Sequence, residues 1–382
     1  MRTSADVVII GGGVIGTSIA YHLAKMGAQN TVVLERESML GTGSTGKCAG
    51  GIRQQFSTEV NIRLAMESVR FFETFREELD ADPEFRQNGY LFLATTEEEV
   101  TAFQQNVALQ RSLGLKVEIL SPPEAKELVP ALNVEDVLLA TYCPTDGYAD
   151  PHSVLQGFAK GARRLGVDMC TDTEATAIER KAGKVRAVAT NQGRIETPVV
   201  VDAAGPWLAI VGGMAGIELP VLPYRRQIFV THPFPAIPNP VPMVIDFQPS
   251  FYFRKEGPGI LMGMTDDEEP PSFNTHADWD FLAQVVEKAI HRAPILEQAG
   301  FMDGWGGLYA VTPDDNPILG PLPELEGFIC AGGFSGHGFM LAPATGRAIA
   351  ELILEGQSTV DISALSINRL REGREFREEQ VI

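Results

Sequence analysis

The stretch Ala5-Asp-Val-Val-Ile-Ile-Gly-Gly-Gly-Val-Ile-Gly16 decides the fold of this chain. Its first six residues form a nearly continuous apolar run, which is typical of a strand buried on both faces. The glycines that follow predict a tight turn, and residues 17–26 have the pattern of a helix that stops at Gly27. A second apolar run, Thr31 to Leu34, predicts a second strand and completes a βαβ unit.

The glycines of this unit have separate tasks. Gly11 permits the tight turn, Gly13 lets the backbone approach a pyrophosphate, and Gly16 lets the helix pack closely on the strand. The N-terminus of the helix directs free N–H groups at the diphosphate. Glu35, placed 19 residues beyond Gly16, can accept hydrogen bonds from ribose hydroxyls and disfavours NADP. The expected dinucleotide contacts are Gly11, Gly13, Val14, Ile15, Gly16, Glu35 and Arg36.

Composition excludes several classes of protein. The chain has 382 residues, 44% of them apolar, which suits a soluble globular protein of two domains, or of one large domain with a substantial insertion. A formal net charge of -19 argues against nucleic-acid binding, because phosphates require a basic surface. No apolar run is long enough for a membrane span, and no basic leader precedes the first strand. The four scattered cysteines lack metal-site or redox spacing, so we expect no metal and a reducing, cytoplasmic environment.

Two further glycine-rich segments favour FAD over NAD. Residues 41–46, Gly-Thr-Gly-Ser-Thr-Gly, offer amides and hydroxyls for phosphate or flavin contacts, and Gly50-Gly51-Ile52-Arg53 extends them. Near the other end, residues 331–340 lead into a helix expected at 344–354. Such a cluster of amides before a helix can stabilise the negative charge that develops on a reduced flavin.

The combination resembles the FAD-dependent D-amino-acid oxidase superfamily, and within it the branch of sarcosine oxidase, glycine oxidase and the β subunits of sarcosine oxidase and proline dehydrogenase. The motifs that carry the resemblance are Gly11–Gly16, Glu35-Arg36, Gly43–Gly46, Val201–Trp207, Thr312–Asp314 and Gly333–Gly338. They cover essentially the whole chain. The resemblance implies further non-covalent FAD contacts at Gly43, Ser44, Thr45, Gly51, Ala175, Ala204, Gly205, Trp207, Gly333, Phe334, Gly336, His337, Gly338, Phe339 and Met340.

The expected fold class is α/β, or α+β overall, with a Rossmann-like FAD-binding domain and a second, antiparallel-sheet substrate domain. The first domain is expected to be discontinuous, comprising residues 1–85, 142–218 and 305–382. The second is expected to comprise residues 86–141 and 219–304. Helical periodicity marks residues 58–79, 97–113, 150–165 and 279–291. Strands are expected at 89–94, 137–141, 168–170, 185–190, 199–202, 227–231, 243–246, 251–254 and 260–264.

The resemblance implies hydride transfer from a C–H beside an amine nitrogen to flavin N5, followed by hydrolysis of the imine. Arg53 aligns with the arginine that holds the substrate carboxylate in monomeric sarcosine oxidase, and a guanidinium suits bidentate carboxylate binding. A salt bridge is the alternative role for Arg53. Tyr252 and Tyr309 are candidates for hydrogen bonding to substrate, with a core position as the alternative. Met340 replaces a second basic residue of the relatives, so the contribution of Arg225 or Arg226 is open.

Two further positions depart from monomeric sarcosine oxidase. Gly307 replaces the cysteine that links covalently to the flavin, so we expect FAD to be bound non-covalently. Leu261 replaces the lysine that activates oxygen, which favours a dehydrogenase with a protein or quinone acceptor. Glycine oxidase also lacks that lysine and uses oxygen, so oxygen stays an alternative. His337 is a candidate general base, but the glycines on both sides favour a role for its backbone amide.

The sequence therefore predicts an FAD-dependent dehydrogenase or oxidase of a small carboxylate-bearing amine such as sarcosine, proline or glycine. A partner subunit or separate electron acceptor is compatible with the acidic balance. The alternative function is a non-catalytic FAD-retaining assembly factor or an electron-transfer subunit.

Overall fold

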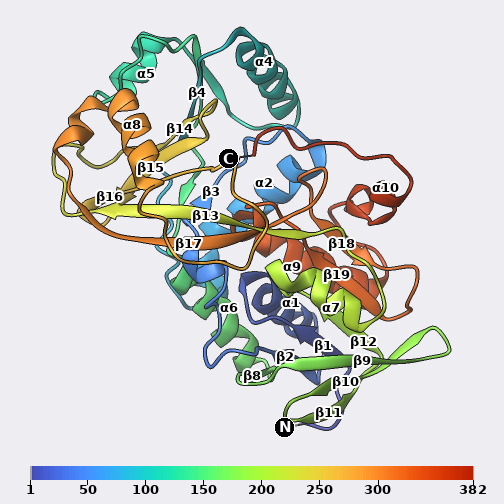
Figure 1. Cartoon of the computed structure of the whole chain (residues 1–382). Coiled ribbons are helices and arrows are strands. Elements are labelled where there is room, and N and C mark those ends of the chain that lie inside the picture. Colours follow the sequence, from blue (N-terminus) through green and yellow to red (C-terminus); the bar gives the residue numbers. More distant parts are fainter. Residues whose placement is uncertain (1, 382) are drawn as a thin grey trace.

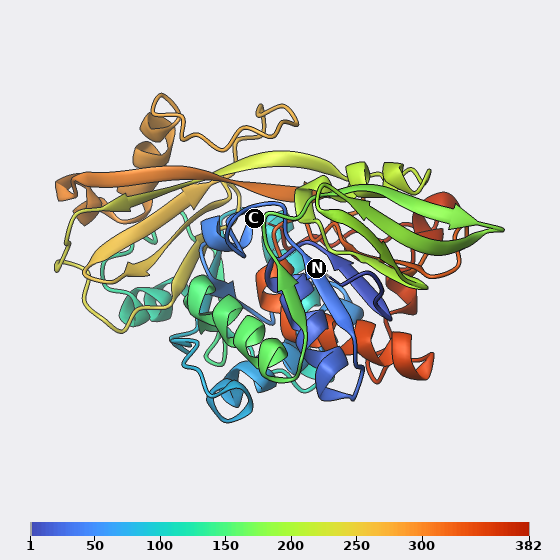
Figure 2. The same cartoon turned by 90° about the horizontal axis from the view of Figure 1, so that it is seen from below.

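The computed structural model describes residues 2–381, which form two parts (Figure 1). The lower part in Figure 1 is built around a six-stranded sheet, and the upper part around an eight-stranded sheet. The long strands β13 (Leu222–Thr231) and β17 (Phe301–Val311) pair along their whole length and extend from the upper part over the lower one (Figure 2). This confirms the expected class, a mixed α/β fold with a second sheet.

The six-stranded sheet has β1 in its interior, as the apolar run of that strand predicts. Its order is β18 (Ile318–Pro321), β19 (Phe328–Gly332), β12 (Val199–Asp202), β1 (Val7–Ile10), β2 (Thr31–Leu34) and β8 (Asp168–Cys170). All neighbours pair in parallel except β18 with β19. Val7 and Ile9 pack into the helical layer on one face, and Val8 and Ile10 pack against the other face.

Helices cover one face of this sheet, and a small sheet covers the other. The helical layer consists of α1 (Val14–Lys25), α2 (Glu59–Glu73), α6 (Pro151–Arg164) and α9 (Gly338–Glu355). The opposite layer consists of β9 (Ala175–Lys181), β10 (Lys184–Thr190), β11 (Gly193–Glu196) and α7 (Leu208–Met214). The expected N-cap at Asp150 is present, because its carboxylate accepts from Ser153 N at 2.7 Å.

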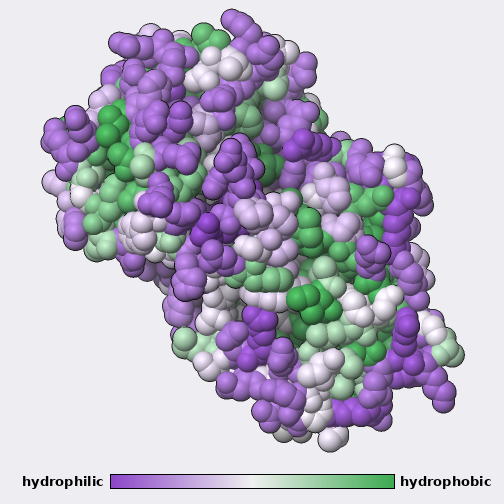
Figure 3. Space-filling view, viewed as in Figure 1, coloured by the Kyte–Doolittle hydropathy of each residue, from purple (hydrophilic) through white to green (hydrophobic). Residues whose placement is uncertain are grey.

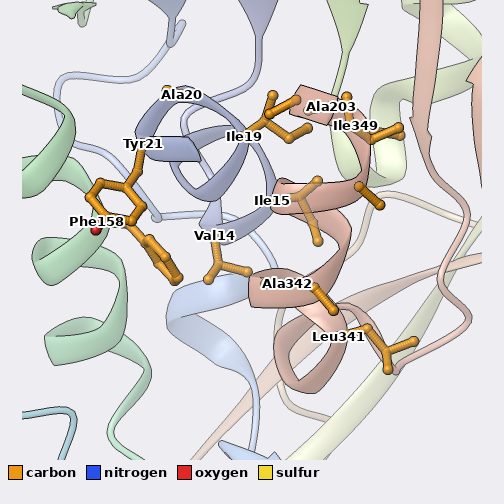
Figure 4. Packing of buried hydrophobic residues seen from close by; sticks show 14 of the residues in the cluster. Val14, Ile15, Ile19, Ala20, Tyr21, Phe158, Ala203, Leu341, Ala342 and Ile349 are labelled. Carbon is orange, nitrogen blue, oxygen red and sulfur yellow. The ribbon is translucent and has the colours of Figure 1, made fainter. Parts of the chain in front are cut away.

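The closest packing in the helical layer joins α1 to α9. Figure 4 shows the two helices side by side, with Ile15 and Ile19 among the buried residues between them. Ser18 Oγ donates to Ala342 O at 2.8 Å, and a Cβ on Gly346 would lie 2.1 Å from that hydroxyl. The helix expected from residue 344 begins at Gly338 instead and contains Pro343. The missing N–H of one proline is offset by the packing of this nearly continuously buried helix.

The eight-stranded sheet is mixed, which corrects the expectation of an antiparallel sheet. Strands β4 (Tyr90–Ala94) and β14 (Met243–Asp246) pair in parallel, with Tyr90 opposite Met243. These strands come from the two separate segments of this part, so no hairpin dictates their direction. The order is β17, β13, β16 (Gly259–Met264), β15 (Phe251–Glu256), β14, β4, β6 (Leu139–Cys143) and β5 (Glu118–Leu120).

The boundaries expected at residues 141/142 and 304/305 fall inside β6 and β17, so each of these strands lies wholly in the eight-stranded sheet. The helix expected from residue 279 begins at Leu282, and the one expected over 58–79 divides at Thr74. The other elements are α3 (Phe75–Leu79), α4 (Glu97–Ser112), α5 (Pro122–Leu128), α8 (Leu282–Arg292), α10 (Asn368–Arg371), β3 (Gly51–Ile52) and β7 (Gly147–Tyr148).

Hydrophilic side chains cover most of the face drawn in Figure 3, in keeping with 50 acidic and 31 basic residues. Within residues 2–381, no helix combines the length and apolar character that a membrane crossing requires.

A buried ion network ties the two chain segments of the upper part together. Arg292, at the end of α8, is 1% exposed and donates to Asp246 on β14 at 2.8 Å and to Asp136 at 2.9 Å. Partial burial raises the pKa of Asp136, but hydrogen bonds from Arg292 and His291 outweigh it and hold this pKa at about 2. The guanidinium of Arg292 therefore links Asp136, in the first chain segment, to Asp246, in the second.

We expect Arg292→Met to lower the free energy of unfolding by about 3–5 kcal/mol, because Asp246 stays buried without its partner. The control Arg63→Met removes an exposed pair with Glu59 on α2 and should change it by less than about 1 kcal/mol. Thermal and urea unfolding of both variants measure this. Equal losses in the two variants would contradict a structural role for the buried network.

Candidate active site

A cavity of about 620 Å³ lies where the two parts meet. Residues from β1, β2, β17 and the start of α9 line it, together with segments 41–53 and 203–207. All the residues named above as FAD contacts line this cavity with the exception of Gly16, and so do Arg53, Tyr252, Tyr309 and Arg226. Arg225, the other basic residue considered for the substrate, does not line it. Gly16 lies behind the wall, where a Cβ would be 2.0 Å from Gly11 O. This close approach is the helix-on-strand packing expected of it.

The turn between β1 and α1 forms a backbone cradle. Gly11 has a φ of +117°, and a Cβ there would lie 2.4 Å from Ala203 O. Gly13 is the N-cap of α1 and provides no side-chain acceptor, while Thr45 Oγ1 accepts from Val14 N at 3.1 Å. The positive end of α1 therefore lines the cavity, with the Thr45 hydroxyl on one of its amides and only backbone at Gly13, which fits a diphosphate.

An acidic residue and an aromatic stack mark one end of the cavity. Glu35 Oε2 accepts from Gly12 N at 2.9 Å, which fixes the carboxylate at the end of β2. The guanidinium of Arg36 lies 3.9 Å from the ring centre of Trp207, and this ring stacks on Phe273 at 5.3 Å. The predicted contacts Ala175, Ala204 and Gly205 line the same cavity. This end fits the adenosine half of a dinucleotide.

The start of α9 forms the other backbone cradle. Gly333 and Gly336 have φ values of +74° and +100°, and a Cβ on Gly336 would lie 2.3 Å from the ring of Tyr309. His337 is the N-cap, and neither a capping side chain nor an acidic first-turn residue occupies the helix N-terminus. Its free amides fit the electron-rich edge of a flavin.

His337 is held as a neutral imidazole. Burial, reinforced by the positive charge of Arg53, holds the pKa of His337 well below its usual range. Its Nε2 lies 3.1 Å from Arg53 Nη2, and an arginine can only donate, so Nε2 is the acceptor. The nitrogen that a general base would use is therefore already occupied.

Arg53 is 2% exposed and lies between the cavity and the C-terminal segment. Its guanidinium donates to the carbonyls of Gln55 and Gln380 and stacks over Phe56 at 4.1 Å. Glu378 lies in the same C-terminal segment. Its carboxylate accepts from the backbone N–H and hydroxyl of Ser57 at 2.7 Å each, which anchors this segment. The sequence alone does not indicate the contact between Arg53 and Gln380, because these residues are 327 positions apart.

A buried carboxylate lies behind this segment. Asp146 is fully buried and accepts from Gln54 N at 2.9 Å, Gln54 Nε2 at 3.0 Å and Gln55 Nε2 at 3.2 Å. Burial raises the pKa of Asp146 to about 6, although these hydrogen bonds oppose the rise. Asp146 thus fixes the backbone immediately after Arg53.

Three phenols converge on the cavity. Within the described residues, no protein group hydrogen bonds to the hydroxyls of Tyr90, Tyr252 or Tyr309, although all three side chains line the space. Burial raises the pKa of each phenol, so all three are neutral donors. Tyr252 and Tyr309 were predicted from the sequence; Tyr90 was not, because an isolated strand tyrosine gives no signal of this position.

The two departures from monomeric sarcosine oxidase at positions 307 and 261 lie in different surroundings. Gly307 lies beside Lys47, so that a Cβ there would be 3.2 Å from Lys47 O. Leu261 is 2% exposed in an apolar cluster with Tyr252 and Ile228. Cys48 brings a thiol to the cavity from another segment, but burial raises the pKa of Cys48 to about 11.

A family model described as FAD dependent oxidoreductase matches residues 6–352. The chain belongs to this family. FAD is the family's cofactor, and the two backbone cradles, the acid at the end of β2 and the intervening cavity fit it.

The chain is also similar to individual proteins of known sequence or structure. The chain is 33% identical to mouse sarcosine dehydrogenase over 97% of its length, but spans 42% of that relative. It is 36% identical to FAD-dependent oxidoreductase domain-containing protein 1 of Xenopus laevis, over 96% of the chain and 82% of the relative. The crystal structure of L-proline dehydrogenase from P. horikoshii superposes with a TM-score of 0.93 at 36% identity, covering 99% of this chain and all of that one.

We expect Gly11→Ala to raise the dissociation constant of FAD at least about tenfold, because the new methyl group displaces the cradle. Gly27→Ala is the matched control, since Gly27 also has a positive φ, +94°, but nothing lies within 4 Å of its Cβ position. The ratio of flavin to protein absorbance after purification, and titration of apoprotein with FAD, measure the effect. Full FAD retention by Gly11→Ala would show that the turn tolerates a side chain.

We expect Asp146→Asn to remove a pH dependence of stability. The raised pKa means that the folded protein retains this proton more strongly than the unfolded chain does. The contribution of Asp146 is therefore complete below its unfolded pKa of about 3.8 and lost as the pH rises through about 6. The stability of wild type relative to Asp146→Asn should fall by about 2 kcal/mol between pH 4 and pH 7. Asp80→Asn, which makes the same substitution at an exposed carboxyl, is the control.

Proposed function

We propose that this chain oxidises a small amine that carries a carboxylate, such as sarcosine, proline or glycine. The convergence of Arg53 with Tyr252 and Tyr309 at one end of the FAD cavity carries the proposal. Such a substrate requires a cation that binds its carboxylate and hydrogen-bond donors for the polar group beside it, and the guanidinium and the free phenols provide these contacts. The names of the sarcosine and proline dehydrogenases that the chain resembles support the same substrate class.

Each residue has a definite part in the proposed reaction. Arg53 retains unused N–H donors beyond its two carbonyl contacts and His337, and these bind the carboxylate. The hydroxyls of Tyr252 and Tyr309 orient the amine, which must be neutral to release electrons from the adjacent C–H bond. FAD supplies the acceptor for the hydride. The oxidised product is an imine, which water hydrolyses.

The proposed electron acceptor is a protein or quinone. The apolar Leu261, rather than a lysine, packs in the buried cluster that contains Tyr252, so position 261 supplies no cation to stabilise superoxide. We further propose that FAD is held non-covalently, since position 307 has no side chain and the thiol of Cys48 is strongly disfavoured as a thiolate.

Anaerobic mixing of the FAD-loaded protein with sarcosine, L-proline, glycine and N,N-dimethylglycine tests the function. We expect at least one of them to bleach the visible flavin band, and the reduced protein to react faster with an artificial electron acceptor than with air. Tyr252→Phe should lower kcat/KM about 10- to 100-fold, because it deletes one donor to the substrate. Tyr142→Phe, whose hydroxyl binds Asn88 O away from the cavity, should not.

No bleaching by any carboxylate-bearing amine would exclude the proposed reaction and favour the assembly or electron-transfer role.

A further inference from the structure

The cavity has an unusual distribution of charge. The acids that line it, Glu35, Glu37 and Glu174, belong to the adenosine end, beside β2 and the start of β9. At the end that contains the three phenols, the lining residues include the cations Arg53 and Arg226 but no acid. Both arginines act electrostatically on the phenol of Tyr309, so both lie close to this one side chain.

Arg226 is a cation without a counter-ion. Its guanidinium lies 5.5 Å from the ring centre of Tyr309 and donates to Arg225 O at 3.0 Å, while its Nε–H is shielded from solvent and has no acceptor. Among the described residues, no carboxylate forms an ion pair with it. Arg226 is only partly buried and lines the cavity, so a ligand bound there can provide the counter-ion that the chain does not supply.

The neighbouring arginine shows the contrast. Arg225 alternates with Arg226 along β13 and faces the other way. Its guanidinium pairs with Glu269 at 2.5 Å and donates to His276 O at 2.8 Å. The chain thus supplies an acid to the arginine that faces away from the cavity and none to the arginine that faces into it, although acids outnumber bases 50 to 31.

Arg53 lacks an ion pair as well. Glu378 and Asp146 act on it electrostatically, but neither lines the cavity and neither forms an ion pair with it in the described part of the chain. Both carboxylates are already engaged by other donors, Ser57 and Thr58 for Glu378 and Gln54 and Gln55 for Asp146. Two separate cations therefore face the proposed substrate.

We propose that the substrate is an amine with two carboxylates, one bound by Arg53 and the second by Arg226. This inference rests on the proposed function and narrows its substrate class to amino dicarboxylates or their N-alkyl derivatives. Tyr309 lies beside both arginines and therefore between the two carboxylate sites. The amine and the reacting C–H bond remain next to the carboxylate that Arg53 binds.

The first test uses unreactive ligands and the oxidised, FAD-loaded protein. Malonate, succinate and glutarate are each compared with the corresponding half-amide, which has a similar shape but one charge fewer. Perturbation of the flavin spectrum gives the dissociation constants. We expect at least one diacid to bind about 10- to 100-fold more tightly than its half-amide, the factor that one charge-assisted contact supplies.

Arg226→Gln should abolish this preference, while Arg63→Gln, which removes the same charge from an exposed site on α2, should retain it. Equal affinity of diacid and half-amide in the wild type would overturn the proposal, even if Arg226→Gln fails to fold. A preference that survives in folded Arg226→Gln would overturn it too.

A kinetic test separates this proposal from the proposed function. Anaerobic reduction is compared for N-methyl-L-aspartate and N-methyl-L-asparagine, and for iminodiacetate and sarcosine. We expect a higher kcat/KM for the dicarboxylate of each pair. If the monocarboxylates reduce the flavin and the dicarboxylates have no higher kcat/KM, the site for a second carboxylate is refuted but the amine oxidation is upheld. Tight diacid binding without reduction by any amine refutes the oxidation but upholds the two-cation site.

Discussion

The architecture depends on the absence of side chains at the turn between β1 and α1. Gly11 approaches Ala203 O, and Gly16 approaches Gly11 O, so closely that a Cβ at either position would overlap the backbone. These contacts press α1 against the sheet and β1 against β12. Because α1 in turn packs on α9 through Ser18 and Gly346, the N-termini of both helices open into the same cavity. One steric constraint thus sets where both helix N-termini meet the cavity.

The sequence could predict this region because its signals are local. A buried strand, glycines at fixed spacing and an acid after the next strand act within thirty-five residues, and the physics that links them needs no distant partner. The pairing of β4 with β14 is different, because strands about 150 residues apart can align in either direction. The start of α9 was placed too late because Pro343 is usually a helix breaker, and only the packing on α1 shows why it is tolerated here.

In the site, too, the features that depend on local sequence could be predicted and those that depend on distant contacts could not. The lining of the cavity followed from glycine-rich motifs, but the surroundings of Arg53 did not. Its contacts with Gln380 and with the chain fixed by Asp146 join segments that are far apart in the sequence. The isolation of Arg226 is also invisible in the sequence, since an unpaired charge is recognised only when the position of every nearby acid is known. In a chain this acidic, the expectation from composition is that each arginine finds a partner.

Because the net charge of the chain is -19, two cations without ion pairs in the cavity wall are a stronger indication of an anionic ligand than they would be in a basic protein. An acidic surface repels anions at long range, but salt screens that repulsion beyond a Debye length of about 8 Å at physiological ionic strength. Inside the cavity, screening is weaker and the effective dielectric constant lower, so nearby cations dominate the potential that a bound ligand experiences. Selection for anions therefore has to be built from residues in the wall. Neutral phenols beside Arg53 and Arg226 add donors without adding negative charge, which leaves the ligand to provide the anions that both guanidinium groups lack.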